Sequence, residues 1–196
     1  KTFTWDEARK IVENGLKPLG QQYLADLNTG LSSGWVDVYE TEGKGSGAYS
    51  WGTYSSHPYV LLNFNGTLEA VFTLAHEMGH AMHSVLSEQN QPKAISDYTL
   101  LGAEVASAVN EGLLMDYLLK NSKDPLERTF LLLRAIEDLE GTFYTQVQFA
   151  EFEVEAHRMV ERGERGDHAE QRLAHRVHLA RPAVRSQVAR VHLSVV

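Results

Sequence analysis

The chain has 196 residues, of which 43% are hydrophobic, and its formal net charge at pH 7 is −8. This length can bury one sizeable core, and the acidic charge argues against general affinity for nucleic acid or for an anionic membrane surface. The absence of cysteine excludes a disulfide scaffold and agrees with a cytoplasmic protein, and no apolar run predicts a transmembrane segment or a signal peptide.

The first third of the chain predicts two helices followed by short strands. Thr4-Trp5-Asp6-Glu7 has the form of a capping box that opens a helix, which Asn14-Gly15 should end, and a second helix should run through Leu27. Strands are expected at 35–40, 48–54 and 59–64, because glycines and a Ser-Ser-His-Pro turn separate these runs.

The rest of the chain from Thr67 predicts helices. The three main runs are 67–87, 98–120 and 125–163, the last broken near Gly141. A small antiparallel or mixed sheet followed by segregated helices indicates an α+β fold that is mostly helical.

The first of these three helices carries the most informative motif, His76-Glu77-Met78-Gly79-His80. Residues four apart lie on one face of a helix, so both histidines can bind one zinc ion. Glu77 then flanks the ion and can act as general base toward a water whose pKa the metal lowers. Gly79 costs the helix about 1 kcal/mol relative to alanine, which suggests that another group approaches the backbone closely there.

A catalytic zinc needs a third protein ligand. His83 lies about 10 Å along the helix axis from His76, too far for one ion near both, so we expect it to support the site or the core. Glu104 is the best remaining choice, because it opens the next helix after a turn-prone stretch at 90–92. Glu111 lies on the same face as Glu104 and could hydrogen-bond a zinc histidine, although a solvated surface carboxylate is an equal alternative.

Several motifs in this order resemble oligoendopeptidase F, of the thimet-oligopeptidase-like zinc metallopeptidases. They occupy residues 34–40, 46–50, 57–63, the zinc helix and 103–107. The resemblance implies a zincin-like catalytic lobe with one zinc on His76, His80 and Glu104, with Glu77 as general base. It also implies short peptide substrates, cleaved in a channel between two helical lobes.

The resemblance further implies a place for the substrate. The run 59–64 looks like the family's edge strand, so a peptide would lie antiparallel to it and add a strand to the sheet. The residues that would contact this peptide are Tyr59, Val60, Leu61, Leu62 and Asn63. The alternative is an ordinary buried core strand.

The resemblance ends at about Gly163, where the composition changes. Residues 161–196 hold seven of the eleven arginines and no lysine. We therefore expect a partial catalytic domain at 1–163 and a basic tail at 164–196, which is either a frameshift product or a genuine extension. The chain begins at Lys1 and enters the family at its catalytic lobe, so we also expect it to be a fragment.

Three function classes follow. The first is a zinc metalloendopeptidase that cuts oligopeptides. The second is a zinc-binding but inactive fragment or pseudoenzyme, because the histidine and tyrosines that stabilise the oxyanion downstream in the family have no match in the tail. The third, a metal-free helical interaction module, requires the histidine pair to be coincidental.

Overall fold

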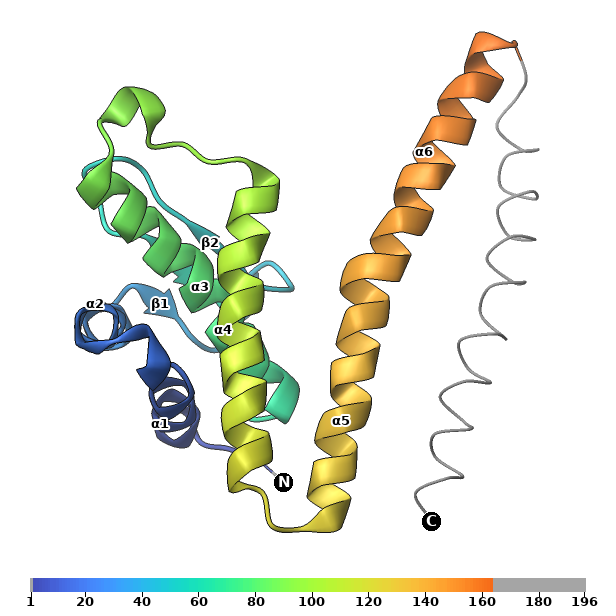
Figure 1. Cartoon of the computed structure of the whole chain (residues 1–196). Coiled ribbons are helices and arrows are strands. Elements are labelled where there is room, and N and C mark those ends of the chain that lie inside the picture. Colours follow the sequence, from blue (N-terminus) through green and yellow to red (C-terminus); the bar gives the residue numbers. More distant parts are fainter. Residues whose placement is uncertain (1, 164–196) are drawn as a thin grey trace. The chain divides into compact units, whose positions relative to one another are not determined.

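The computed structural model describes residues 2–163, and the chain divides into two compact units between Leu131 and Leu132 (Figure 1). The described elements of the first unit are α1 (Trp5–Gly15), the 3-10 helix η1 (Lys17–Leu19), α2 (Gln21–Ser32), β1 (Val36–Asp37), β2 (Tyr49–Trp51), β3 (Tyr59–Leu61), α3 (Leu68–Asn90), η2 (Lys93–Ile95), α4 (Leu100–Asn121) and the first part of α5 (Pro125–Leu139). The second unit continues α5 through a π-helical turn (Glu140–Tyr144) into α6 (Thr145–Glu161).

Local sequence signals explain where the helices begin. The Thr4 side chain accepts from the backbone of Glu7, and the Glu7 carboxylate accepts from the backbone of Thr4, so the expected capping box is present. Thr67 and Thr99 cap α3 and α4 through their hydroxyl oxygens alone, which accept from the backbone N–H groups of Ala70 and Gly102. These caps lie within two residues of the predicted helix starts.

The break expected near Gly141 is the π-helical turn between α5 and α6. The chain continues as a helix on both sides of this turn. Among residues 2–163, no helix is both long and apolar enough to cross a membrane.

The sheet is mixed, with strand order β1-β3-β2. β3 pairs parallel to β1 and antiparallel to β2. The expectation that the run beginning at Tyr59 forms an edge strand is therefore wrong, because β3 is the central strand. The strands are also shorter than predicted, since pairing covers only two or three residues of each apolar run.

The core of the first unit surrounds α3, which packs against α4 and against the sheet (Figure 1). Ten residues of α3 are buried, and they pack with apolar side chains from α1, α2, β3 and α4. The largest fully buried side chains include Leu27, Val60, Phe72, Met78 and Leu114. The predicted α+β, mostly helical architecture is confirmed. The helix at the centre of this core, α3, is the one that carries the predicted metal-binding motif.

Candidate metal centre

His76 and His80 lie one turn apart on α3 and turn their rings toward each other. Their Nε2 atoms are 3.1 Å apart, and the ring planes meet at 86°. Neither ring is fully buried, with 28% and 15% of the side-chain surface exposed, so a small ligand can reach both nitrogens. The spacing of the two residues along the helix produces this convergence directly.

Glu104 reaches the same point from α4. Its Oε2 lies 3.5 Å from His76 Nε2 and 3.8 Å from His80 Nε2. Ligand atoms bound at 2.0–2.1 Å around a tetrahedral zinc stand roughly 3.3 Å apart, so the three atoms lie near the separations around one such ion, with His80 and Glu104 the widest pair. The structure thus brings together the three predicted ligands, all of whose ligand atoms lie within 4.8 Å of one another.

The close approach of α4 to α3 depends on Gly79. A Cβ atom on Gly79 would lie 2.7 Å from Ser107 Cα and 3.0 Å from the Ala106 carbonyl oxygen. The prediction that another group approaches this backbone closely is confirmed, and that group is the backbone of α4. The buried Ser107 hydroxyl also donates to the Glu104 carboxylate at 3.0 Å and so holds it toward the histidines.

Glu111 lies beside the far nitrogen of His76. Its Oε1 is 3.3 Å from Nδ1, which leaves Nε2 with a lone pair for a metal. Burial lowers the pKa of His76, but the hydrogen bond and charge of Glu111, with the charges of Glu77 and Glu104, outweigh burial and leave this pKa raised. The opposite holds for His80, whose pKa is lowered by burial and then by the charge of His76.

Glu77 is 6% exposed and lies directly after His76. Its Oε2 is a buried atom with no hydrogen-bond partner among the described residues. Burial, aided by the charges of Glu104 and Glu111 and opposed by that of His76, raises the pKa of Glu77 to about 7. A carboxylate with this pKa can accept and release a proton near neutral pH.

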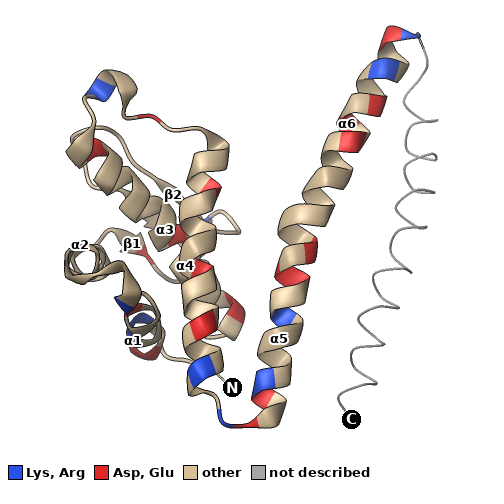
Figure 2. Cartoon of the chain, in the orientation of Figure 1, with Lys and Arg blue, Asp and Glu red and all other residues tan. Residues whose placement is uncertain are grey.

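Three carboxylates therefore surround two imidazoles. Two of them belong to α4. This helix carries three acidic residues, Glu104, Glu111 and Asp116, and one basic residue, Lys120, near its C-terminal end (Figure 2). Like charges this close repel one another, and a bound divalent cation would offset that repulsion. Nitrogen and carboxylate donors of this kind suit zinc, so the residues present fit the metal that the motif predicts.

His83 lies outside this convergence. Its ring stacks on Tyr98 with centroids 3.9 Å apart, and burial lowers its pKa. Tyr98 in turn shares a 2.6 Å hydrogen bond with Ser84. His83 thus packs against the segment that leads into α4.

The five residues predicted to contact a peptide do not form one surface. Val60 and Leu62 are 2% exposed and belong to the core, whereas Tyr59 is 57% exposed. Asn63 donates to the carbonyls of Gly45 and Gly47 and so ties down the preceding loop. The backbone of β3 pairs with strands on both sides, which leaves no free edge for a peptide.

A hollow of about 280 Å³ lies beside the first two turns of α3 and does not include the metal-binding residues. Its lining residues include Ala48, Leu62 and Thr73, which lies one turn before His76 on α3. The hollow is therefore a neighbour of the centre and not the centre itself.

Asn110 and Tyr23 are part of the site's support, and sequence reasoning missed both. Asn110 is 1% exposed and donates from Nδ2 to the Ala75 carbonyl at 3.0 Å, while the Tyr23 hydroxyl donates to Asn110 Oδ1 at 2.9 Å. The available signal was a polar pair, Ser107 and Asn110, one turn apart and in phase with the apolar Leu114.

Comparison with known proteins identifies the class of the chain. The model of peptidase family M3 matches residues 9–184, so the chain belongs to peptidase family M3. The match extends past Gly163 into residues outside the described part, and the proposed boundary between a catalytic domain at 1–163 and a tail at 164–196 stays a prediction.

Individual relatives narrow this class to oligoendopeptidase F, as the motifs predicted. The chain is 44% identical to oligopeptidase PepF of Bacillus subtilis over 161 residues, covering 82% of this chain and 24% of that protein. It is 43% identical to an oligoendopeptidase F homolog of Lactococcus lactis over 162 residues, covering 83% and 27%. The chain thus spans about a quarter of the length of the curated relatives it matches.

Solved structures agree in fold. A crystal structure of a candidate peptidase from Chlamydophila abortus superposes with a TM-score of 0.73 at 46% identity, covering 83% of this chain and 28% of that one. A candidate oligoendopeptidase F from Bacillus anthracis superposes with a TM-score of 0.69 over 87% of this chain and 30% of that one, at 18% identity. The second likeness concerns the fold alone.

Proposed function

We propose that this chain carries the metal-binding and proton-transferring part of a zinc metalloendopeptidase that hydrolyses short oligopeptides. The observation that carries the proposal is the convergence of His76 Nε2, His80 Nε2 and Glu104 Oε2, with Glu77 buried beside them. Membership in peptidase family M3 supports peptide hydrolysis, and the names of the relatives support short peptides as substrates.

In this proposal each residue has one task. His76, His80 and Glu104 hold the metal, and Glu111 orients His76 through Nδ1. A bound zinc ion would lower the pKa of water toward neutrality and polarise the carbonyl of the peptide bond. The Glu77 carboxylate accepts a proton of the attacking water and later delivers it to the leaving amine.

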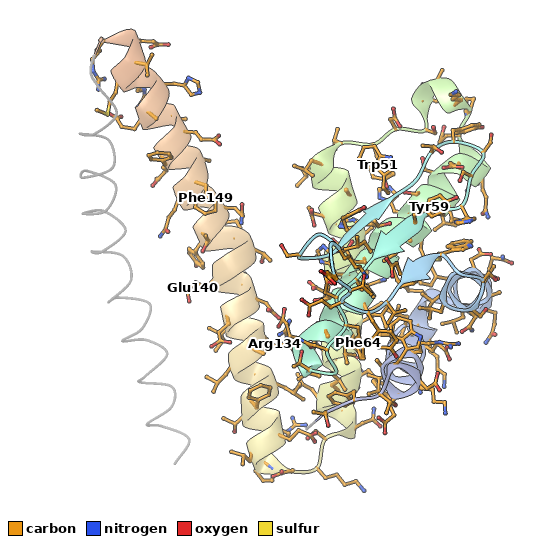
Figure 3. The ribbon with its side chains drawn as sticks, turned by 180° about the vertical axis from the view of Figure 1, so that it is seen from behind. Trp51, Tyr59, Phe64, Arg134, Glu140 and Phe149 are labelled. Carbon is orange, nitrogen blue, oxygen red and sulfur yellow. The ribbon has the colours of Figure 1, made fainter. Side chains whose placement is uncertain are left out.

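The proposed peptide-binding strand is β2, in place of the run at β3 that the sequence predicted. β2 pairs with β3 on one side, and no described strand pairs with its other side. α3 packs against β2, so a peptide added to that free edge would lie next to the helix that bears His76 and His80. Trp51 on β2 is 70% exposed, opposite the exposed Tyr59 of β3 (Figure 3). Strand addition uses main-chain hydrogen bonds and makes few demands on substrate sequence.

The proposal also keeps the localisation and the binding partners that the sequence predicted. The cysteine-free composition supports a cytoplasmic protein, and the acidic net charge supports one that binds neither nucleic acid nor membrane.

The decisive experiment measures zinc content by elemental analysis after exhaustive dialysis. Wild type should hold one zinc per chain, and Glu104→Ala should lose it. Asp116→Ala is the matched control, because it removes another carboxylate of α4, whose ion pair among the described residues is with Lys120. Equal zinc in Glu104→Ala and wild type would reject the ligand set.

Turnover of a fluorogenic, internally quenched oligopeptide then separates the two metal-binding classes. An active wild type whose turnover disappears in Glu77→Gln, with zinc retained, supports the peptidase. Zinc binding without turnover in wild type would instead identify the inactive metal-binding form.

A further inference from the structure

Two linked hydrogen bonds join three helices beside the residues of the metal centre. They run from the Tyr23 hydroxyl on α2 to Asn110 on α4 and then to the backbone carbonyl of Ala75 on α3. Asn110 is 1% exposed, and its two side-chain polar atoms each have one partner from a different helix. The Ala75 carbonyl can only accept a hydrogen bond, so the amide of Asn110 must turn its Nδ2 toward this carbonyl. Its Oδ1 then accepts from the Tyr23 hydroxyl, which favours the same orientation.

These hydrogen bonds lie one residue from a proposed metal ligand on α3 and one residue from the carboxylate on α4 that orients that ligand. Ala75 precedes His76, and Asn110 precedes Glu111, which contacts His76 Nδ1 at 3.3 Å. One turn earlier on α4, Ser107 packs on Gly79 and holds Glu104. The Asn110 contact thus sits between the two carboxylates that α4 brings to the centre.

A slip of α4 along α3 would move both carboxylates at once. One residue of helical rise is about 1.5 Å, whereas a metal ligand must stand within about 0.2 Å of its ideal distance. Apolar contacts such as those of Leu114 are not directional and resist a small slip weakly. A buried amide resists it strongly, because any displacement leaves polar atoms unpaired.

We propose that Asn110, oriented by Tyr23, is a positioning residue that sets the register of α4 against α3 and thereby the affinity of the centre for its metal. Neither side chain touches the metal-binding atoms. The inference rests on the metal site of the proposed function and adds to it the residues that place its third ligand.

Tyr23→Phe tests the proposal with the least disturbance. It keeps the ring in the core and removes only the hydroxyl that orients Asn110. The matched control is Tyr54→Phe, which removes a hydroxyl that donates to the Gln91 carbonyl at the far end of α3 and does not involve α4. The zinc dissociation constant is measured by competition with a chelator, and the melting temperature of the metal-free chain is measured beside it.

We expect Tyr23→Phe to raise the zinc dissociation constant about tenfold, the lower end of the effect of residues that orient metal ligands. Tyr54→Phe should leave this constant unchanged. The proposal is overturned if Tyr23→Phe lowers the melting temperature but binds zinc as tightly as wild type, since that result describes a structural hydrogen bond only. It is equally overturned if both variants weaken zinc binding alike.

A second variant and a second measurement test the proposal independently. Asn110→Leu replaces the amide with an apolar side chain of similar size, and the visible absorption of the cobalt-loaded chain reports the number and arrangement of ligands. A changed spectrum with a folded chain supports a register role, and an unchanged spectrum and affinity contradict it. If Asn110→Leu does not fold, Tyr23→Phe decides alone. If wild type binds no zinc, the metal site of the proposed function fails first, which is a distinct result.

Discussion

Gly79 of α3 and Ser107 of α4 are packed backbone against backbone, since a Cβ on Gly79 would come within 2.7 Å of Ser107 Cα. A helix backbone cannot yield as the tip of a flexible side chain can, so any residue larger than glycine must push the helices apart. Glu104 lies one turn before Ser107 and depends on this contact for its distance to the histidines.

Gly79→Ala should therefore weaken zinc binding and lower stability together. Alanine favours a helix by about 1 kcal/mol relative to glycine, but overpacking costs typically 1–3 kcal/mol, so the net change is destabilising. Thermal unfolding of the metal-free chain and the zinc dissociation constant measure the two effects.

Gly112→Ala provides the matched control for that substitution. Gly112 also lies inside a helix, α4, and a Cβ there meets nothing within 4 Å. Alanine should raise the free energy of unfolding by up to about 1 kcal/mol and leave zinc affinity unchanged. Similar behaviour of the two alanine variants would contradict the role assigned to Gly79.

The buried Glu77 carboxylate should contribute stability to the metal-free chain at acidic pH that is lost at alkaline pH. Its pKa is about 7 in the folded chain against an ordinary value of 4.5, so between these values the folded state binds a proton that the unfolded state does not. The stabilisation is complete below pH 4.5 and is lost as the pH rises through 7. A difference of this size corresponds to about 3 kcal/mol.

Glu77→Gln checks this prediction, because glutamine has the same shape and does not titrate. The variant should remove this part of the pH dependence and be more stable than wild type at pH 8 in the absence of metal. Parallel curves of unfolding free energy against pH for the two proteins would show that Glu77 does not titrate as described. The catalytic base would thus be retained at a cost in stability.

Glu111→Gln should change how zinc binding depends on pH. Glu111 raises the pKa of His76, so protons compete with the metal there at higher pH than at an ordinary histidine. Glutamine lacks the charge, which lowers this pKa, and it also orients the ring less firmly, which weakens binding by about tenfold at pH 8. The deficit should shrink as the pH falls toward 6. A deficit that is constant with pH would mean that Glu111 acts on orientation alone.

The helices were easier to predict than the sheet for a physical reason. The starts of α3 and α4 follow from a threonine cap and an apolar repeat, which are local signals within one turn. The place of β3 in the sheet depends on which strands pair with it, and those partners lie up to 24 residues away in the sequence, as for Val36 and Val60. An apolar run indicates that a strand is buried, but it does not indicate which strands pair with that strand.

The same distinction applies to the site. The spacing of His76 and His80 on one helix is sufficient to predict that their ring nitrogens converge, and the structure places Glu104 beside them. Tyr23 and Asn110 are 87 positions apart in the sequence, and neither belongs to a motif. Their contact exists only because α2 and α4 meet, so it becomes visible only in three dimensions.

The free edge of β2 offers a test of where the peptide lies. Val60 donates its N–H to the carbonyl of Trp35, the residue just before β1, and the main-chain groups of successive strand residues point to opposite sides. Ser50, which stands opposite Val60, therefore directs its own N–H and carbonyl away from β3, toward the free edge. Proline at position 50 removes that outward N–H and is tolerated best on an edge strand.

Ser50→Pro should weaken the binding of an uncleaved oligopeptide to the zinc-loaded Glu77→Gln chain, measured by calorimetry. Loss of one main-chain hydrogen bond, worth about 0.5–1.5 kcal/mol, corresponds to roughly 2- to 13-fold in the dissociation constant. Ser50→Ala keeps the N–H and should bind as the parent does, and zinc content should be equal in all three proteins. Unchanged binding in the proline variant would place the peptide away from β2, because strand addition there requires this N–H.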